Sequence, residues 1–381
     1  MKKSIFILTP LFFSLTIISC NQSSKKKDTV ALPDISQFKG QIDGKDVSLF
    51  YLKNKNGMEA AFTNFGARVE ALIVKDKDGN QHDVVLGFNK ATDYNNPEEP
   101  YYGAIVGPFA NRIANGTFSL DGQTYHLPQN NGRNTLHGGL KGLHFQVWDA
   151  KQLSDTSLEF TCNLSDGTEG FPGNRQFNVT YTLTPNNELV IHYEATTDKP
   201  TVINLSNHSY FNLNGEGNGT ILNQKLQIFA NQFTPVDSTL IPTGKPEDVK
   251  GTPLDFTQPK TIGKDINVKY DQLAFGRGYD FNYVLSGEKE DGYNLACKMT
   301  GDKTGIVMEI LTDQPGLQFY SGNFMADRTT LSNGVKDSYR TAVALEPQHF
   351  PDSPNQPDFP STILNPGEKY QSTSVYRFSN E

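Results

Sequence analysis

The chain has 381 residues and a formal net charge of −8, a length that allows one large domain or two ordinary ones. No basic stretch is interleaved with aromatic residues, so the acidic balance argues against nucleic acid as a partner. The 25 Phe and 16 Tyr are enough for a sizeable core, with aromatic side chains left for a binding cleft.

Residues 1–19 have the pattern of a secretory signal peptide. Lys2 and Lys3 precede an apolar stretch at 5–18, whose helix would rise about 21 Å, too short for a hydrocarbon core of about 30 Å. The stretch ends in Ser19-Cys20, which resembles a bacterial lipobox and predicts lipidation at Cys20. We therefore expect an exported bacterial lipoprotein, anchored in a membrane and facing the periplasm or the cell surface. An ordinary signal peptide that contains a cysteine is the alternative.

Residues 20–37 are predicted to be a tether between the lipid and the folded domain. The stretch 21–28 is polar and charged and has no apolar residue with which to bury a core. Its lysines could contact anionic lipid, but a solvated spacer is the simpler interpretation. Beyond the tether, export would permit a disulfide between Cys162 and Cys297, and two buried thiols are the simpler alternative.

From residue 38 to residue 381 the sequence is typical of one domain of short strands. Runs rich in Val, Ile, Tyr, Phe and Thr alternate with Gly, Asn, Asp and Pro, and few windows have the spacing of an amphipathic helix. Asp121-Gly122 favours a tight hairpin. These patterns predict an all-β fold, a large antiparallel β-sandwich. The expected strands are 47–52, 68–74, 84–88, 117–120, 123–127, 177–183, 188–195, 294–299, 305–311 and 370–378.

The segment 201–213 is predicted to be a strand with two unlike faces, because side chains alternate along a strand. A polar face on a strand this aromatic suggests a lined site, and a solvent-facing surface is the alternative. The pattern alone leaves open whether its histidine is catalytic or structural. One face would carry Ile203, Leu205, Phe211 and Leu213, and the other Asn204, Ser206, His208 and Tyr210.

A second polar residue in an apolar segment is Glu346. On a strand it would share a face with Ala342 and Ala344, whose small side chains leave room for a ligand beside the carboxylate. Val343 and Leu345 would face the core. A surface glutamate at the end of a strand is the alternative.

Two loops have compositions that suit a binding site. One is 110–113, and the other is 134–139, in which Gly138 and Gly139 follow His137 and permit close approach of a ligand. A tight turn with a capping polar residue explains each loop equally well. None of the seven His has convincing metal-ligand spacing, and no phosphate-binding glycine loop is present, so we expect neither a metal nor a cofactor.

Taken together, six segments in order resemble the aldose 1-epimerase (galactose mutarotase) family, from about residue 40 to the C-terminus. They are 110–113, 134–139, 207–213, 278–280, 314–323 and 345–348.

The resemblance implies interconversion of the α and β anomers of a free aldose, such as glucose or galactose, by ring opening and closure. It implies that His208 is the general acid and Glu346 the general base, on a large antiparallel β-sandwich. The expected partner is a monosaccharide, and the expected state is a monomer or a weak dimer. The residues implied to bind the sugar are Asn111, Arg112, His137, Asp280 and Gln314.

Two departures from the family pattern leave the preferred sugar open. Gly107-Pro108 stands where the family usually has Gly-Arg, and Asp280-Phe281-Asn282 stands where it usually has Asp-His-Asn. Three rival functions also remain. One is a glycosidase that uses Glu346 and Asp280, and another is a non-catalytic glycan-binding lipoprotein. The third, an epimerase for phosphorylated sugars, would need extra Arg or Lys in the pocket, and export argues against it.

Overall fold

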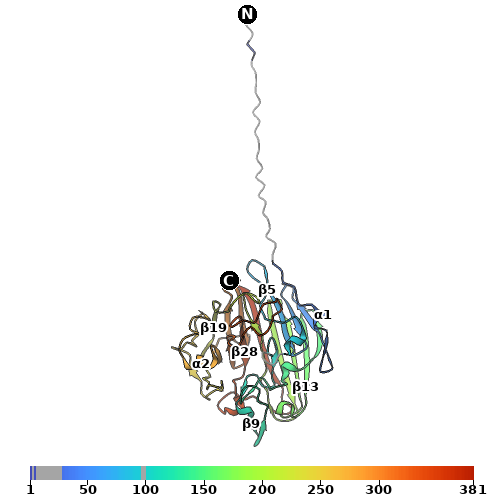
Figure 1. The fold of residues 1–381 in the computed structure, drawn as a ribbon, viewed down its shortest axis with the longest axis vertical. Helices are drawn as coiled ribbons and strands as arrows, with labels where there is room; N and C mark the ends of the chain where they lie inside the picture. The colour runs from blue at the N-terminus through green and yellow to red at the C-terminus, as the bar shows by residue number, and fades with distance from the viewer. Residues whose placement is uncertain (2–3, 6–27, 96–99) are drawn as a thin grey trace.

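The computed structural model describes residues 1, 4–5, 28–95 and 100–381 (Figure 1). The predicted signal peptide lies almost wholly outside these residues, and so does the lipidation site predicted at Cys20. Within the described ranges, no helix has the length and apolar character needed to cross a membrane. The α-helices there are short, as expected, and are α1 (Ile35–Phe38) and α2 (Asp271–Gly276).

A ten-stranded antiparallel sheet forms one layer of the fold. Its central strands alternate between buried and more exposed positions, which is the pattern of a sheet with one face on the core. In spatial order the strands are β12 (Asp149–Ser154), β13 (Ser157–Leu164), β14 (Arg175–Leu183), β15 (Glu188–Thr197), β30 (Tyr370–Asn380), β26 (Ile306–Thr312), β25 (Tyr293–Thr300), β19 (Lys225–Ile228) and β22 (Lys260–Thr261), and β24 (Lys289–Glu290) pairs with β25.

A six-stranded antiparallel sheet packs against it and carries the residues that matter for function. Its order is β18 (Tyr210–Phe211), β28 (Val343–Gln348), β27 (Gly316–Tyr320), β23 (Asp280–Leu285), β20 (Ala230–Phe233) and β21 (Glu247–Asp248).

Besides these two layers, the fold has a four-stranded sheet from the N-terminal part of the domain and five two-stranded pairs. The sheet contains β3 (Leu49–Lys53), β4 (Glu59–Thr63), β5 (Arg68–Lys75) and β6 (Gln81–Asp83). The pairs are β1 (Gly40–Ile42) with β2 (Lys45–Val47), β7 (Ile105–Val106) with β17 (Ser206–Asn207), β8 (Arg112–Ile113) with β11 (Thr135–Leu136), β9 (Thr117–Leu120) with β10 (Gln123–His126), and β16 (Thr201–Val202) with β29 (Ile363–Leu364).

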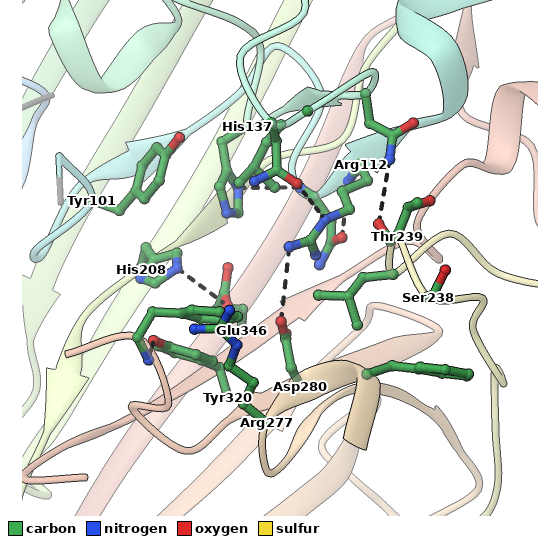
Figure 2. A pocket seen from close by; sticks show the side chains of 18 of the residues that line it. Tyr101, Arg112, His137, His208, Ser238, Thr239, Arg277, Asp280, Tyr320 and Glu346 are labelled. Atoms are coloured by element: carbon green, nitrogen blue, oxygen red, sulfur yellow. Dashed lines mark hydrogen bonds and ion pairs between the residues drawn. The ribbon is translucent and has the colours of Figure 1, made fainter. Parts of the chain in front are cut away.

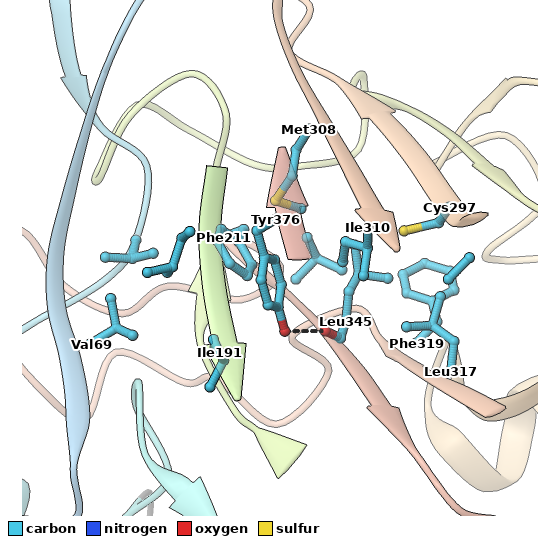
Figure 3. Close-up of a cluster of buried hydrophobic side chains, with 14 of the residues drawn as sticks. Val69, Ile191, Phe211, Cys297, Met308, Ile310, Leu317, Phe319, Leu345 and Tyr376 are labelled. Carbon is cyan, nitrogen blue, oxygen red and sulfur yellow. Dashed lines mark hydrogen bonds between the residues drawn. The ribbon is translucent and has the colours of Figure 1, made fainter. Parts of the chain in front are cut away.

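The main core lies between the large sheet and the six-stranded sheet (Figure 3). Ile310 and Tyr376 come from the first sheet, and Phe319 and Leu345 come from the second. The Tyr376 hydroxyl donates to the carbonyl of Leu345 at 3.4 Å, which satisfies a polar group inside the core. The predicted antiparallel β-sandwich is therefore confirmed.

Most expected strands are present, but the expected strand at 84–88 is not. Only Val85 there forms an isolated bridge, to Phe211. The expected continuous strand at 201–213 is also wrong. That segment breaks into β16, β17 and β18, which pair with β29, β7 and β28 respectively. Because it crosses between sheets, residues of both predicted faces are buried, so the solvent-facing alternative fails too.

The domain makes contacts before residue 38, where we expected it to begin. Val30 and Leu32 pack against a small cluster that includes Ile73, and the Tyr51 hydroxyl donates to the carbonyl of Pro33 at 2.6 Å. Val30, Leu32 and Pro33, within the stretch that we predicted to be the tether, thus contact the folded domain.

The two cysteines of the domain are free and buried, and both belong to the main core. The interpretation of Cys162 and Cys297 as buried thiols is confirmed. Figure 3 shows Cys297 beside the apolar side chains of the two sheets.

Candidate active site

The face of the six-stranded sheet that points away from the main core forms the floor of a cavity of about 550 Å³ (Figure 2). The strand register explains which side chains reach it. Asp280 lies opposite Tyr320, and Glu346 lies two residues along β28 from Ala344, the partner of Tyr320. Paired residues, and residues two apart, share a face. Asp280, Tyr320 and Glu346 therefore project to the same side of the sheet.

Glu346 obeys the alternation predicted from the sequence. Val343 and Leu345 join the main core, whereas Ala344 packs on the opposite side with the aromatic cluster that contains Tyr210. The Glu346 side chain is only 2% exposed, so the surface alternative is wrong. Among the described residues, its Oε2 has no hydrogen-bond partner, which leaves a buried acceptor for a ligand to satisfy.

His208 lies in the turn between β17 and β18 and faces Glu346 (Figure 2). Its amide donates to the carbonyl of Ala104, and its own carbonyl accepts from the amide of Gly103. This backbone anchoring holds the ring in place. His208 Nε2 lies 3.6 Å from Glu346 Oε1, so the two groups that we predicted to be acid and base do meet.

Aromatic rings surround His208. Tyr101 stacks on it with a centroid distance of 5.6 Å, and Tyr210 lies 5.0 Å away. His137 meets the ring edge-on at 5.1 Å. These contacts restrict the imidazole to one orientation and keep it in an apolar environment.

His137 is held by the loop that contains Asn111. The Asn111 amide donates to His137 Nδ1 at 3.2 Å, and the His137 amide donates to the Asn111 carbonyl. A neutral imidazole has one acceptor nitrogen, so this contact leaves the Nε2–H of His137 as a donor. Both residues have left-handed backbone, with φ of 64° and 52°, a strained conformation that is common at binding sites.

Arg112 and Asp280 form the other polar pair of the cavity. Arg112 Nη2 lies 3.8 Å from Asp280 Oδ2, and Arg112 Nε donates to Asn131 at 3.0 Å. Gln318 donates to the remaining oxygen of Asp280 at 2.6 Å. Figure 2 shows the ion pair bridging the cavity between the N-terminal loops and β23. Both partners can bind hydroxyl groups, Arg112 through its forked donors.

Gln314, the remaining residue predicted to bind the sugar, does not line the cavity. Its side chain bonds to Asp313 at 3.2 Å and to His349 at 2.8 Å. The register gives the reason. Glu346 lies opposite Gln318 on the neighbouring strand. Gln314 precedes Gln318 by four residues, which places it about 13 Å away from Gln318 at the rise of an extended chain. The structure brings together the other four predicted binding residues.

Burial dominates the ionisation of the acid–base pair. It lowers the pKa of His208 to about 3, against a backbone hydrogen bond that raises it. Burial also raises the pKa of Glu346 well above its ordinary value, helped by Asp280 and opposed by Arg112. A neighbouring carboxylate such as Glu346 favours the charged form of His208, but removal of both groups from water outweighs that attraction.

The remaining site histidine and carboxylate follow the same rule. Burial, with smaller effects of His208, His144 and Arg112, lowers the pKa of His137 well below its usual range. Burial raises the pKa of Asp280, while Arg112 and the hydrogen bond from Gln318 lower it. His137 is therefore a neutral donor at physiological pH.

His137, His208 and Glu346 together could be mistaken for a metal centre, since one ligand atom from each lies within 4.8 Å of the others. Two His and one Glu are a ligand set that zinc accepts. However, the single lone-pair nitrogen of neutral His137 already accepts from the Asn111 amide. The donor set does not fit a metal unless that hydrogen bond breaks.

Several lining residues were not predicted from the sequence. Tyr101 precedes the motif 110–113 in the chain but belongs to no motif that we identified. Arg133, Arg277 and Arg328 also line the cavity. They come from loops far apart in the chain, and no local pattern could bring them together.

Comparison with known proteins agrees with this geometry. Residues 48–377 match the family model of aldose 1-epimerase. The chain is 43% identical to bovine galactose mutarotase over 316 residues, which is 83% of this chain and 90% of that protein. It is 36% identical to aldose 1-epimerase of Escherichia coli K12, over 89% and 97% of the two chains.

A solved aldose epimerase homologue from C. elegans superposes with a TM-score of 0.79 at 32% identity, and the match covers 88% of this chain and 99% of that one. A galactose 1-epimerase from Lactobacillus acidophilus gives a TM-score of 0.78 at 28% identity, over 90% and 97% of the chains. The chain therefore belongs to the aldose 1-epimerase family, and it is an isomerase that interconverts the α and β anomers of sugars.

Proposed function

We propose that His208 and Glu346 are the acid and the base of this reaction, acting on a free aldohexose. The observation that carries the proposal is their 3.6 Å approach on the floor of the cavity, with Glu346 Oε2 unsatisfied among the described residues. Glucose and galactose are the proposed substrates, since relatives at about 40% identity are named for galactose.

The chemistry needs two proton transfers and no other reactant. Glu346 takes the proton of the anomeric hydroxyl, the bond between C1 and the ring oxygen breaks, and His208 gives a proton to that oxygen. Rotation about the C1–C2 bond presents the other face of the aldehyde. Ring closure then returns both protons to their starting groups, so atoms and charges balance.

The pair carries one exchangeable proton throughout. Carboxylate with imidazolium has the same number of protons as carboxylic acid with neutral imidazole, and ring opening converts the first arrangement into the second. Burial favours the second arrangement. It therefore favours the open-chain intermediate relative to the closed sugar, which is the differential stabilisation that catalysis requires. Before ring opening, a sugar hydroxyl that donates to Glu346 favours the ionised carboxylate form of that residue.

The other cavity residues are proposed to position the sugar. His137 donates from Nε2, Arg112 donates through its guanidinium, and Asp280 accepts from a hydroxyl. Asn111 acts indirectly, because its amide fixes the tautomer of His137. Gln314, which the resemblance implied, would need a rearrangement to take part, since it bonds to Asp313 and His349.

Polarimetry on freshly dissolved α-galactose tests the acid–base assignment. His208→Asn and Glu346→Gln should each lower the enzymatic rate at least about 100-fold. Arg377→Gln, which alters ion pairs on β30 remote from the cavity, serves as the control. A rate like that of the wild type in either site variant would contradict the assignment.

A glycosidase is the weaker candidate because Asp280 is engaged by both Arg112 and Gln318, which leaves it poorly placed as a second catalytic carboxylate. Release of reducing sugar from oligosaccharides would favour it, and a mutarotase should produce none. A binding protein without activity would leave the spontaneous rate of anomer exchange unchanged.

We further propose that the protein is exported and held in a membrane by an acyl chain on Cys20, as a monomer or weak dimer. The support is the apolar stretch that ends in Ser19-Cys20. Cys20→Ala should abolish incorporation of radiolabelled palmitate and release activity from the membrane fraction. Continued labelling of that variant would contradict the anchor, and sedimentation at several concentrations would give the oligomeric state.

A further inference from the structure

Behind the floor of the cavity, the polar face of the six-stranded sheet continues into the interior. Asn282 pairs with Gln318, and Gln318 pairs with Glu346, so these three side chains share one face of neighbouring strands. Gln348 lies two residues beyond Glu346 on β28 and shares that face. The three amide side chains are at most 3% exposed, and none of them lines the cavity. We call Asn282, Gln318, Glu346 and Gln348 the polar row.

The polar row contains a concentration of unpaired polar atoms. Among the described residues, fourteen buried side-chain nitrogen and oxygen atoms have no hydrogen-bond partner, and six of them belong to the polar row. The six are both amide atoms of Asn282 and of Gln348, Oε1 of Gln318 and Oε2 of Glu346. Native proteins satisfy nearly all such atoms, with protein groups or with ordered water. Six of them in one place indicate a bound molecule.

Gln318 shows what kind of molecule is needed. Its Nε2 donates to Asp280 Oδ1 at 2.6 Å, which fixes the orientation of the amide, since the reverse orientation would set an oxygen against the carboxylate. The remaining atom, Oε1, and Oε2 of ionised Glu346 are both acceptors. They belong to paired residues, whose Cβ atoms lie about 5 Å apart. Neither atom can satisfy the other, whereas a water molecule, with its two donors, can join them.

Gly316 brings the other two amides to the same place. It pairs with Gln348 on the neighbouring strand. A Cβ on Gly316 would lie 2.4 Å from Asn282 Oδ1, so the Asn282 amide occupies the space over the glycine and approaches Gln348. Each of these amides offers two N–H donors and an acceptor oxygen. Together they supply the two to four polar partners that a buried water requires.

We propose that the polar row holds ordered water against Glu346 Oε2, and that Asn282 and Gln348 are positioning residues that fix this water behind the proposed base. The inference rests on the acid–base function proposed above and adds the source of the hydrogen bonds to the carboxylate. Water donates to Oε2, while His208 faces Oε1 at 3.6 Å from the cavity side (Figure 2). These hydrogen bonds favour the ionised form of Glu346, which is the form that takes the anomeric proton.

Apolar variants of the polar row separate this effect from that of nearby charges. Asn282→Leu and Gln348→Met keep approximately the size of each side chain and leave every charge in place. The titratable or charged groups of the described residues that lie around Glu346 are His208, His137, Arg112, Asp280 and Tyr376. None of these groups is altered, so a shift in the pH profile of either apolar variant reports the hydrogen bonding of Glu346.

Crystal structures of the protein without sugar and with galactose test the occupant. We expect water within hydrogen-bond distance of both Glu346 Oε2 and the Gln348 amide in each structure, because the polar row lies behind the cavity. The same water should be lost in Gln348→Met. Amides that bond directly to one another, or a galactose hydroxyl that takes the place of the water, would overturn the inference.

The pH dependence of kcat/KM for galactose tests the role of the two positioning residues. Without water on Oε2 the carboxylate is less favoured, so the pKa of Glu346 rises and the acid–base pair keeps its shared proton to higher pH. The alkaline midpoint should therefore move up by about one unit in Asn282→Leu and in Gln348→Met. Gln348→Asn keeps an amide and leaves room for a further water, so its midpoint should stay near that of the wild type. Two independent positions keep the test valid if one variant folds poorly.

An unchanged midpoint in both apolar variants, or an equal shift in Gln348→Asn, would overturn the positioning role. A loss of activity without a shift would mean that these residues only support the fold, and it would overturn that role as well. Inactivity of the wild type toward galactose would instead overturn the proposed function. The crystal structures test for the water independently of activity, so the two failures are distinguishable.

Discussion

Replacing Asp280 with asparagine removes one negative charge from the cavity floor while keeping the shape of the side chain. Asp280 and Glu346 lie two strands and two residues apart on one face of the sheet. The carboxylate of Asp280 raises the pKa of Glu346, in addition to the larger effect of burial. The substitution should therefore lower the pKa at which the acid–base pair loses its shared proton.

The size of the shift follows from the geometry. Strand spacing of about 4.8 Å and a rise of about 3.4 Å per residue separate the two Cα atoms by about 12 Å. Carboxylates that lean toward the common cavity are then on the order of 8 Å apart, and at an effective dielectric constant of about 20 their repulsion is about 2 kcal/mol. This corresponds to a pKa change of between about one and two units.

The assay is the pH dependence of kcat/KM for galactose, which reports groups of the free enzyme. In Asp280→Asn the alkaline midpoint should move to lower pH by about one unit. The position of this midpoint is the readout, because loss of a hydroxyl acceptor will also lower the plateau. Glu290→Gln, at an exposed ion pair with Arg377, should leave the midpoint in place. A midpoint in Asp280→Asn that stays fixed or moves to higher pH would refute the coupling.

Three further predictions concern the pH dependence of activity, the effect of a metal chelator and the pH dependence of stability. Since burial lowers the pKa of His208 to about 3, kcat/KM should be nearly as high at pH 5 as at pH 7, and a loss centred near pH 6.5, the ordinary histidine value, would contradict this. Dialysis against a chelator should leave activity unchanged, because His137 already uses its lone pair on Asn111; recovery that depends on an added divalent ion would show that this reasoning is wrong. Burial raises the pKa of Glu70, so its contribution to stability is complete below its unfolded pKa and declines as pH rises through the folded one. Glu70→Gln should therefore gain stability relative to the wild type as pH rises, by at most about 1.4 kcal/mol per pH unit, and a gain in urea unfolding that does not change between pH 5 and pH 8 would be evidence against a protonated Glu70.

The sequence predicted best where local pattern decides the structure. Alternation in a single strand placed Glu346 beside Ala344 and opposite the core, and β28 has that arrangement. The hairpin at Asp121-Gly122 formed as predicted, because a tight turn is specified by its own residues. His208 was identified from the resemblance, since the strand used to argue for its polar face does not exist as one strand.

The parts that could not be predicted depend on contacts between distant segments. Tyr101 stacks on His208 across more than a hundred residues of sequence, and Arg133, Arg277 and Arg328 reach the same cavity from separate segments. The lowered pKa of His208 depends on such packing as well. The sequence shows that a carboxylate is available as a neighbour, but only the packed structure shows that water is excluded from both groups.

The residues that carry out proton transfer and the residues that can select the sugar lie in different parts of the cavity. The proton-transfer pair lies at the floor, where Glu346 belongs to a central strand and His208 is fixed by backbone hydrogen bonds to Gly103 and Ala104. Arg133, Arg277 and Arg328 also line the cavity but are exposed, and exposed side chains outside the packed sheets tolerate substitution better than buried ones. A change among the exposed lining residues can therefore alter which aldose is bound without moving the groups that open its ring. It follows that membership of the aldose 1-epimerase family specifies the reaction more strongly than it specifies the sugar.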